Sequence, residues 1–235
     1  MIKAIFFDLD GTLLPMDQDK FVNAYMTLLA KKASKYGYES DLLIKTIWQG
    51  TKKMLANDGS KKNEEIFWDV FTLVYGKEAL KDKNIFDEFY YNEFQLAKDS
   101  CGYNKLAKEV VDKVKEKGYK LVLATNPVFP AVATESRIKW AGVNPNDFDI
   151  YTTYENSYHS KPNLEYYKDL LRLIDCDANE CVMIGNDVDE DMIAESLGMD
   201  TFLLTDCLIN KSNKDISGFK QGNFDELLKY IENLK

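Results

Sequence analysis

The chain has 235 residues, with 39 Asp and Glu against 30 Lys and Arg, a net charge of -9 and 45% hydrophobic residues. This composition is that of a folded globular protein, and it excludes a disordered or fibrous chain. Arg137 and Arg172 are the only arginines, so the acidic chain lacks the basic patch that binding to a nucleic-acid backbone requires.

The apolar start at residues 1–7 is too short for the hydrophobic region of a signal peptide, and no stretch approaches the roughly 20 residues of a membrane span. The four cysteines form no CxxC pair, and a single histidine leaves little for a zinc site. We therefore expect a cytoplasmic protein in a reducing compartment, without a membrane or nucleic-acid partner.

Short apolar runs mark the strands of the expected core. Residues 2–7 predict a fully buried strand, and similar runs recur at 120–124, 181–184 and 201–204, with a weaker candidate at 149–153. Helical patterns lie at about residues 103–117, 129–140, 163–174, 189–197 and 223–234. This alternation predicts an α/β fold, a Rossmann-like parallel sheet with helices on both faces.

From residue 17 to residue 98 the alternation stops, and four helical patterns follow one another. We therefore expect an inserted all-helical domain at 17–98 and a core domain built from 1–16 plus 99–235. The aromatic residues of the insert recur at i, i+3 and i+4, which indicates packing within a helical bundle rather than a ligand site. Phe21 and Tyr25, one turn apart, could close over a substrate, although packing within the insert is the simpler interpretation.

Polar side chains follow the ends of the predicted strands. Ligands of parallel α/β sheets bind beyond the carboxyl ends of the strands. The segments found there are Asp8-Leu9-Asp10-Gly11-Thr12, Thr125-Asn126, Lys161-Pro162 in a later loop, and the acidic run from Gly185 to Asp191. We expect these segments to form one site.

The residue types suit phosphoryl transfer, which depends mainly on positioning and electrostatic stabilisation. Asp8 can attack phosphorus as a nucleophile, and Asp10 can give a proton to the leaving oxygen and later take one from water. Thr125 and Asn126, with the backbone N–H groups around Gly11, can bind the phosphoryl oxygens. Lys161 can hold Asp8 and the phosphoryl group together.

This set of motifs, in this order, resembles the haloacid dehalogenase superfamily of phosphotransferases. The resemblance implies a phosphatase with an aspartyl-phosphate intermediate on Asp8, and a mobile helical cap inserted between the first and second motifs. An Asp at position 10 accompanies phosphate-ester chemistry in that family. The substrate is then a small phosphorylated metabolite, and hinges are expected near residues 14–17 and 98–103.

The acidic run predicts a Mg²⁺ site, because this cation prefers oxygen ligands. The resemblance adds the Asp8 carboxylate and the Asp10 backbone carbonyl as ligands. It places Asn186 at the remaining ligand position, with the carboxylate of Asp187 one residue later. Asp187 is the favoured ligand, and Asn186 is the alternative.

Other acidic residues and the histidine have simpler interpretations. Asp191 is expected either to contact the metal-binding or catalytic residues without touching the metal or to stabilise the N-terminus of the next helix. Asp189 and Glu190 are expected to be solvated. His159 is expected to be exposed and uninvolved. The alternatives to a phosphatase are a phosphomutase of the same superfamily and a non-catalytic phosphate-binding protein.

Overall fold

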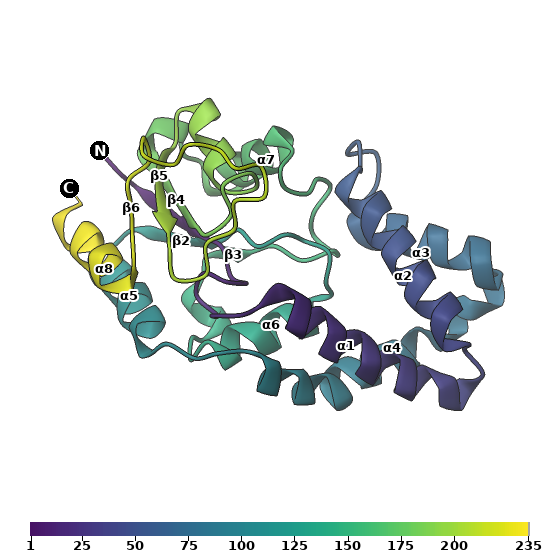
Figure 1. Ribbon diagram of the computed structural model, residues 1–235. Helices are drawn as coiled ribbons and strands as arrows, with labels where there is room; N and C mark the ends of the chain where they lie inside the picture. Colours follow the sequence, from purple (N-terminus) through teal and green to yellow (C-terminus); the bar gives the residue numbers. More distant parts are fainter. Residues whose placement is uncertain (235) are drawn as a thin grey trace.

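A computed structural model describes residues 1–234 of the chain. A six-stranded sheet has the order β3-β2-β1-β4-β5-β6, and all neighbouring strands are parallel (Figure 1). The strands are β1 (Ala4–Phe7), β2 (Lys120–Leu123), β3 (Ile150–Tyr151), β4 (Cys181–Gly185), β5 (Asp200–Leu204) and β6 (Gln221–Gly222). The prediction of a parallel α/β fold is confirmed.

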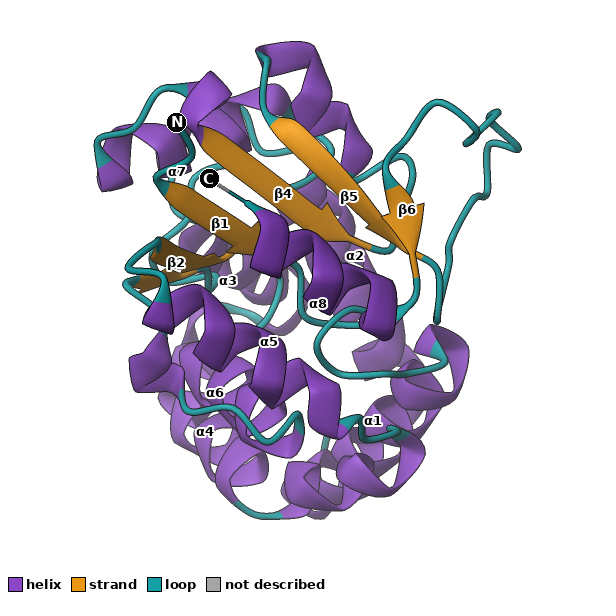
Figure 2. Ribbon diagram, turned by 90° about the vertical axis from the view of Figure 1, so that its left-hand side faces the viewer, coloured by secondary structure: helices purple, strands orange, loops and turns teal. Residues whose placement is uncertain are grey.

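Helices cover both faces of the sheet because the strand side chains alternate between two apolar layers. In β1, Ile5 and Phe7 face the layer that contains α5 (Lys105–Glu116) and α8 (Phe224–Asn233). Ala4 and Phe6 face the opposite layer, with α7 (Leu164–Ile174) and the 3-10 segment η6 (Met192–Leu197). Figure 2 shows α5 and α8 in front of the strands.

Four helices follow one another between β1 and α5, as the sequence predicts. They are α1 (Gln18–Ala33), α2 (Ser40–Leu55), α3 (Asn63–Tyr75) and α4 (Lys83–Tyr91). Short 3-10 segments lie between or after them, namely η1 (Ser34–Tyr36), η2 (Lys77–Asp82) and η3 (Glu93–Ser100), and two more, η4 (Pro145–Asp147) and η5 (Ala178–Glu180), lie in the core. The division into a cap at 17–98 and a core stays a prediction.

The inserted helices pack on the core through aromatic side chains. Phe94 of η3 is fully buried, and its ring stacks on Trp140 of α6 (Ala131–Trp140) with 5.1 Å between ring centroids. Phe71 and Phe89 are also buried within the insert. The interpretation of these aromatic positions as packing residues is confirmed, and one continuous apolar cluster joins the sheet to the insert.

A second contact between insert and core is polar and centres on Asn63, the fully buried first residue of α3. Its side-chain amide donates to the carbonyl of Pro127 and to the hydroxyl of Ser160, each at 3.0 Å. The Ser160 hydroxyl donates in turn to the carbonyl of Met54 at 3.1 Å. The Asn63 backbone N–H donates to the carbonyl of Ser157 at 2.9 Å. The start of α3 is thereby tied to two loops of the core.

The structure differs from the sequence prediction after β4. A helix was expected over residues 189–197, but the regular part is only the 3-10 segment Met192–Leu197. The preceding residues form turns because the Asp187 carboxylate accepts hydrogen bonds from the N–H groups of Asp189 and Glu190, at 2.8 and 2.9 Å. The two-residue strand β6 was not predicted, since two residues carry no periodicity.

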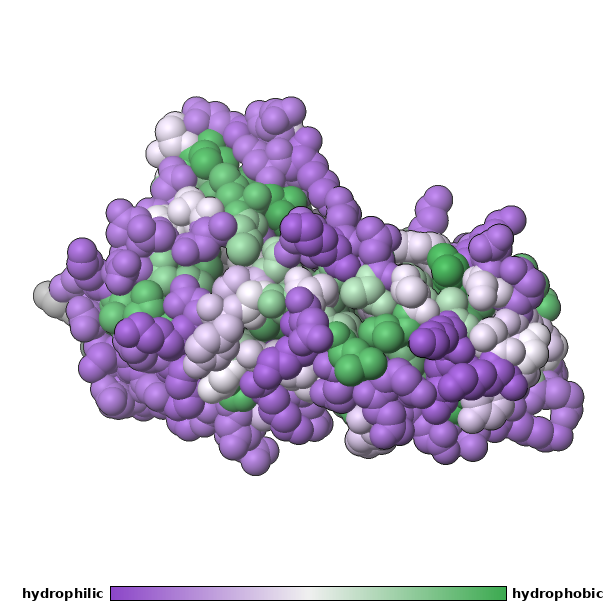
Figure 3. Space-filling view, turned by 60° about the horizontal axis from the view of Figure 1, so that its bottom comes forward, coloured by the Kyte–Doolittle hydropathy of each residue, from purple (hydrophilic) through white to green (hydrophobic). Residues whose placement is uncertain are grey.

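The surface gives no sign of a membrane-spanning segment. Among residues 1–234, none of the helices combines the length and the apolar character needed to cross a bilayer. The face shown in Figure 3 is largely hydrophilic, and its hydrophobic residues form separate patches.

Replacement of Phe94 by Ala tests the aromatic contact between insert and core. We expect the free energy of unfolding to fall by about 3–5 kcal/mol, because a fully buried ring is lost and a cavity remains. Tyr91, which is 69% exposed, provides the control, and Tyr91→Ala should change stability by less than about 0.5 kcal/mol. Chemical denaturation measures both, and equal losses would show that Phe94 is not a packing centre.

Candidate active site

The predicted site residues meet at the carboxyl ends of three neighbouring strands. Asp8 follows β1, Thr125 lies just beyond β2, and Asn186 follows β4. A small cavity of about 50 Å³ lies at this edge and has room for a few water molecules. It is lined by Asp8, Asp10, Gln18, Thr125, Asn126, Asn186, Asp187, Glu190 and Asp191.

Lys161 links two of the carboxylates, although it does not itself line the cavity. Its ammonium lies 2.9 Å from Asp8 Oδ1 and 2.6 Å from Asp191 Oδ1, and the side chain is 1% exposed. Burial lowers the pKa of Lys161, but the facing carboxylates of Asp191 and Asp8 outweigh it and raise the pKa well above its usual value. Lys161 therefore lies against Asp8, as predicted, and the two carboxylates favour its charged form.

Thr12 joins Asp8 to Asn186. Its buried hydroxyl lies 3.1 Å from Asp8 Oδ2 and 2.9 Å from Asn186 Oδ1. One hydroxyl hydrogen can serve only one of these two oxygens at a time. The sequence contains Thr12 within its first motif, but no role was predicted for it.

Two glycines allow the loops to approach one another. A Cβ atom on Gly11, whose φ is +87°, would lie 2.4 Å from the Asn186 side chain. A Cβ atom on Gly185 would lie 2.1 Å from Asp191 Oδ2, which accepts a hydrogen bond from the Asp187 N–H at 3.0 Å. Asp191 is thus a buried partner of Lys161, in agreement with its expected supporting role.

Asp10 contacts a residue that the sequence analysis missed, Arg137 of α6. The guanidinium Nη1 bonds to Asp10 Oδ2, and Arg137 is fully buried. Burial raises the pKa of Asp10 to about 6, the Arg137 charge opposes this rise, and the Asp8 charge adds to it. The only signal in the sequence was the scarcity of arginine, since the two residues lie 127 positions apart.

Several hydrogen-bond donors around the cavity have no partner within residues 1–234. The hydroxyl of Thr125 donates to no residue within 1–234, although the backbone carbonyl of Thr125 accepts bonds from Thr152 and Tyr166 at 2.6 and 2.9 Å. The backbone N–H groups of Leu9, Asp10 and Asn126 likewise bond to no other described residue. Such donors at one edge of the sheet can donate hydrogen bonds to the oxygens of a bound anion.

The position of Glu190 differs from the sequence prediction. We expected a solvated acid, but Glu190 lines the cavity, and its Oε2 accepts a hydrogen bond from Asn126 at 3.0 Å. Burial raises the pKa of Glu190. The neighbouring Asp189 does lie near the surface, where it bonds to Ser212 and Lys214.

The charges around the cavity favour a divalent cation. Five acidic residues line it, namely Asp8, Asp10, Asp187, Glu190 and Asp191, and Lys161 and Arg137 form ion pairs with three of them. In the described part of the chain, no three acidic, histidine or cysteine side chains converge on a single metal position. The ligands predicted from the sequence, namely the Asp8 carboxylate, the Asp10 carbonyl and either Asp187 or Asn186, do not require three such side chains at one position. The Asp10 carbonyl accepts no hydrogen bond from residues 1–234.

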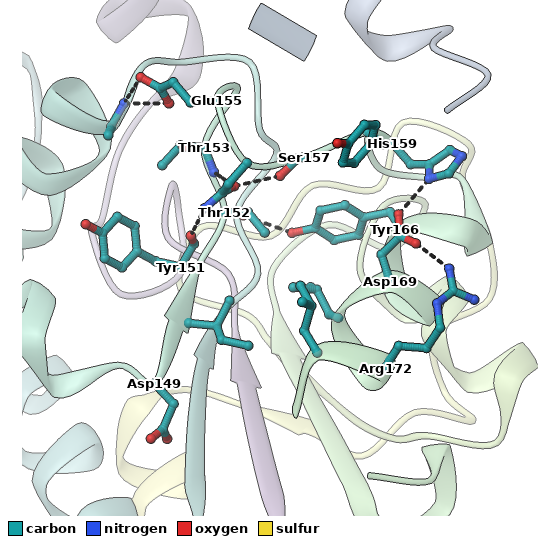
Figure 4. A pocket seen from close by; sticks show the side chains of 16 residues that line it. Asp149, Tyr151, Thr152, Thr153, Glu155, Ser157, His159, Tyr166, Asp169 and Arg172 are labelled. Atoms are coloured by element: carbon teal, nitrogen blue, oxygen red, sulfur yellow. Dashed lines mark hydrogen bonds and ion pairs between the residues drawn. The ribbon is translucent and has the colours of Figure 1, made fainter. Parts of the chain in front are cut away.

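His159 lies in a separate groove, shown in Figure 4. Its Nδ1 is 2.7 Å from Asp169 Oδ2, and a Cβ atom on Gly59 of the insert would lie 2.5 Å from its Nε2. His159 is largely buried, contrary to expectation, but it does not line the small cavity. It therefore takes no part in the candidate site.

Phe21 and Tyr25 also lie outside the cavity. Both are buried, and both pack against Phe94 and Phe129. The Tyr25 hydroxyl is 3.1 Å from that of Tyr90. Both residues therefore have a packing role, but they pack between the insert and the core and not within the insert alone, because Phe129 belongs to the core.

Comparison with known proteins gives a consistent result. The model of the haloacid dehalogenase-like hydrolase family matches residues 2–195. The chain is similar to a glyceraldehyde 3-phosphate phosphatase from Methanocaldococcus jannaschii, with 27% identity over 100% of this chain and 99% of the relative. It is also similar to a ribulose-1,5-bisphosphate 5-phosphatase from Halopiger xanaduensis, with 26% identity over 86% of this chain and 84% of the relative.

Among solved structures, the chain resembles a HAD-hydrolase from Bacillus subtilis that was crystallised with magnesium bound. The TM-score is 0.59 and the identity 19%, over 98% of this chain and 99% of the other. At this identity the likeness shows the fold alone.

Replacement of Gly185 by Ala tests the contact with Asp191. The new methyl group would push the Asp191 carboxylate away from Lys161, so we expect the free energy of unfolding to fall by about 2 kcal/mol or more. Gly218, which has open space around its Cβ position, provides the control. Gly218→Ala should stay within about 0.5 kcal/mol of the parent in chemical denaturation. Equal stability of the two variants would contradict the close approach.

Proposed function

The chain belongs to the haloacid dehalogenase-like hydrolase family and is a phosphatase of that family, and we propose that it hydrolyses a small phosphorylated metabolite with magnesium. The observation that carries the proposal is the Asp8 carboxylate, fixed beyond β1 by Lys161 and Thr12 at the wall of an acidic cavity. A carboxylate held in this way can attack phosphorus and form an aspartyl phosphate.

Asp8 is proposed as the nucleophile because its contacts hold the carboxylate in a fixed orientation. Lys161 holds Oδ1 at 2.9 Å, and Thr12 lies 3.1 Å from Oδ2. The Asp8 N–H donates to the carbonyl of Ile184 at 2.9 Å, which fixes the backbone against β4. Such preorganisation lowers the barrier because little reorganisation is needed during reaction.

Asp10 is proposed as the proton donor and acceptor. It lines the same cavity as Asp8, and its pKa near 6 allows both protonation states close to neutral pH. In the first half-reaction Asp10 would protonate the leaving oxygen. In the second it would accept a proton from the water that attacks the phosphoryl group on Asp8.

The unpaired donors around the cavity support binding of the phosphoryl oxygens. We propose that the Thr125 hydroxyl, the Asn126 N–H and the N–H groups of Leu9 and Asp10 provide these bonds, with Lys161 as the cation. The predicted contribution of the Asn126 side chain is less favoured, because its amide nitrogen is engaged with Glu190 at 3.0 Å.

Mg²⁺ would supply positive charge to the phosphoryl oxygens when bound. We propose that the Asp8 carboxylate, the Asp10 carbonyl and the Asn186 amide oxygen hold it. Asn186 is now preferred to Asp187, because Asn186 Oδ1 and Asp8 Oδ2 lie on either side of the Thr12 hydroxyl, whereas Asp187 Oδ1 accepts two backbone hydrogen bonds.

We propose a sugar or triose phosphate as the substrate class, since two relatives are phosphatases named for such compounds. The cavity of about 50 Å³ is small, so the rest of the substrate requires the insert to move away from the core. A phosphomutase would use the same aspartyl phosphate and remains the alternative. A reducing, cytoplasmic location is also proposed, because all four cysteines are free.

Asp8→Asn tests the nucleophile while preserving its size. We expect magnesium-dependent release of free phosphate from a panel of sugar and triose phosphates to fall by at least about 10³-fold. Asp19→Asn, at an exposed position of α1, is the matched control and should retain full activity. Activity that survived in Asp8→Asn would refute the mechanism. Phosphate transfer between sugar positions without release of free phosphate would instead indicate a phosphomutase.

Magnesium titration separates the two candidate ligands. Removal of metal with a chelator should abolish activity, and added Mg²⁺ should restore it. Asn186→Leu removes the amide oxygen, so we expect the half-saturating Mg²⁺ concentration to rise by about tenfold or more. Asp187→Asn keeps an oxygen for its backbone bonds and should raise that concentration by less than about threefold. The reverse order would make Asp187 the ligand.

A further inference from the structure

Arg137 is a fully buried cation at the boundary between insert and core, and the proposed reaction gives it no role. It is fully buried on α6, and its Nη1 contacts Asp10 Oδ2. A buried arginine is stable only if its charge is paired, because desolvation is expensive. The pairing with Asp10 therefore accounts for the presence of a charge at this depth.

The guanidinium is held on several sides. Its Nε donates to the carbonyl of Ala133 at 3.3 Å, and Nη2 lies 3.4 Å from the Thr134 hydroxyl. The ring of Phe129 lies against it, with 4.3 Å between the guanidinium carbon and the ring centroid. A planar group fixed by these contacts can set the direction of its carboxylate partner.

The two oxygens of Asp10 consequently differ. Oδ2 is bound by Arg137, whereas Oδ1 is buried and has no hydrogen-bond partner among residues 1–234. Asp10 also lines the small cavity beside Asp8. A buried oxygen without a partner at a reaction site is costly unless a bound molecule completes its bonding.

We propose that Arg137 is a positioning residue that holds the Asp10 carboxyl group so that Oδ1 exchanges the proton during phosphoryl transfer. This inference rests on the proposed function. As the Asp8 oxygen bonds to phosphorus, the bond to the leaving oxygen breaks, its electron pair stays on that oxygen, and the proton moves there from Oδ1. When water attacks phosphorus, its proton passes to Oδ1 and the electron pair of the broken bond returns to Asp8.

Leaving groups of different basicity distinguish this role from a structural one. A p-nitrophenolate leaves without a proton, whereas a benzyl alkoxide needs one, and both compounds place a similar ring in the site. The value of kcat/KM reports only the steps up to formation of the aspartyl phosphate. A residue that positions the acid should therefore matter much more for benzyl phosphate than for p-nitrophenyl phosphate.

The variants are Arg137→Lys, which keeps the positive charge but loses the planar guanidinium group, and Arg137→Met, which loses both. We expect kcat/KM to fall by on the order of 10²-fold for benzyl phosphate and by less than about tenfold for p-nitrophenyl phosphate. With p-nitrophenyl phosphate, kcat should fall by more than kcat/KM does, because the attack of water on the aspartyl phosphate also depends on Oδ1. For the same reason a burst of p-nitrophenolate should appear. Arg172→Gln, at the chain's other and exposed arginine, is the control and should change neither value.

Asp10→Asn completes a double-mutant cycle. If Arg137 acts only through Asp10, then Arg137→Met should cause no further loss in the Asp10→Asn background. This double variant also leaves no buried carboxylate unpaired, so it tests the proposal even where Arg137→Met alone fails to fold. Equal losses on both substrates, or a further loss in the Asp10→Asn background, would overturn the role of Arg137. An Asp10→Asn variant without leaving-group dependence would instead refute the proposed role of Asp10.

Discussion

The ammonium of Lys161, held between Asp8 and Asp191 and almost excluded from solvent, is the interaction on which the site depends. It connects the end of β1, the loop before α7 and the loop after β4 in one buried arrangement. Two acids at this depth would repel each other without it. The same contact requires Gly185, because a side chain there would occupy the position of the Asp191 carboxylate.

The parts of the fold that follow from periodicity could be predicted, and the parts that follow from single contacts could not. Apolar runs predict four of the six strands, the weaker candidate at 149–153 contains β3, and the parallel order follows from the alternation of strands with helices. The turns after Asp187 replace an expected helix because one carboxylate accepts two backbone hydrogen bonds. Glu190 was expected to be solvated, because the sequence gives no sign of its hydrogen bond with Asn126, 64 residues away in the chain.

In the candidate site, too, some residues could be predicted from the sequence and others could not. Its motif residues are recognisable because each follows a strand end, and the structure brings Asp8, Asp10, Thr125 and Asn186 to one cavity. Arg137 belongs to no motif and reaches Asp10 only through the packing of α6. Its surroundings also differ from those of Lys161: an aromatic ring lies against the flat guanidinium, whereas the compact ammonium fits between two carboxylates.

The buried amide of Asn63 has a consequence for how such enzymes diversify. It bonds to Pro127 and Ser160, which lie directly beside Asn126 and Lys161. The insert therefore completes the hydrogen bonding of two loops that carry the chemistry. A helical insert transplanted from another family member onto this core must bring an equivalent amide to this position, or the two loops lose a shared partner. Position 63 of the insert is therefore constrained by two loops of the core as well as by the packing of its own helix.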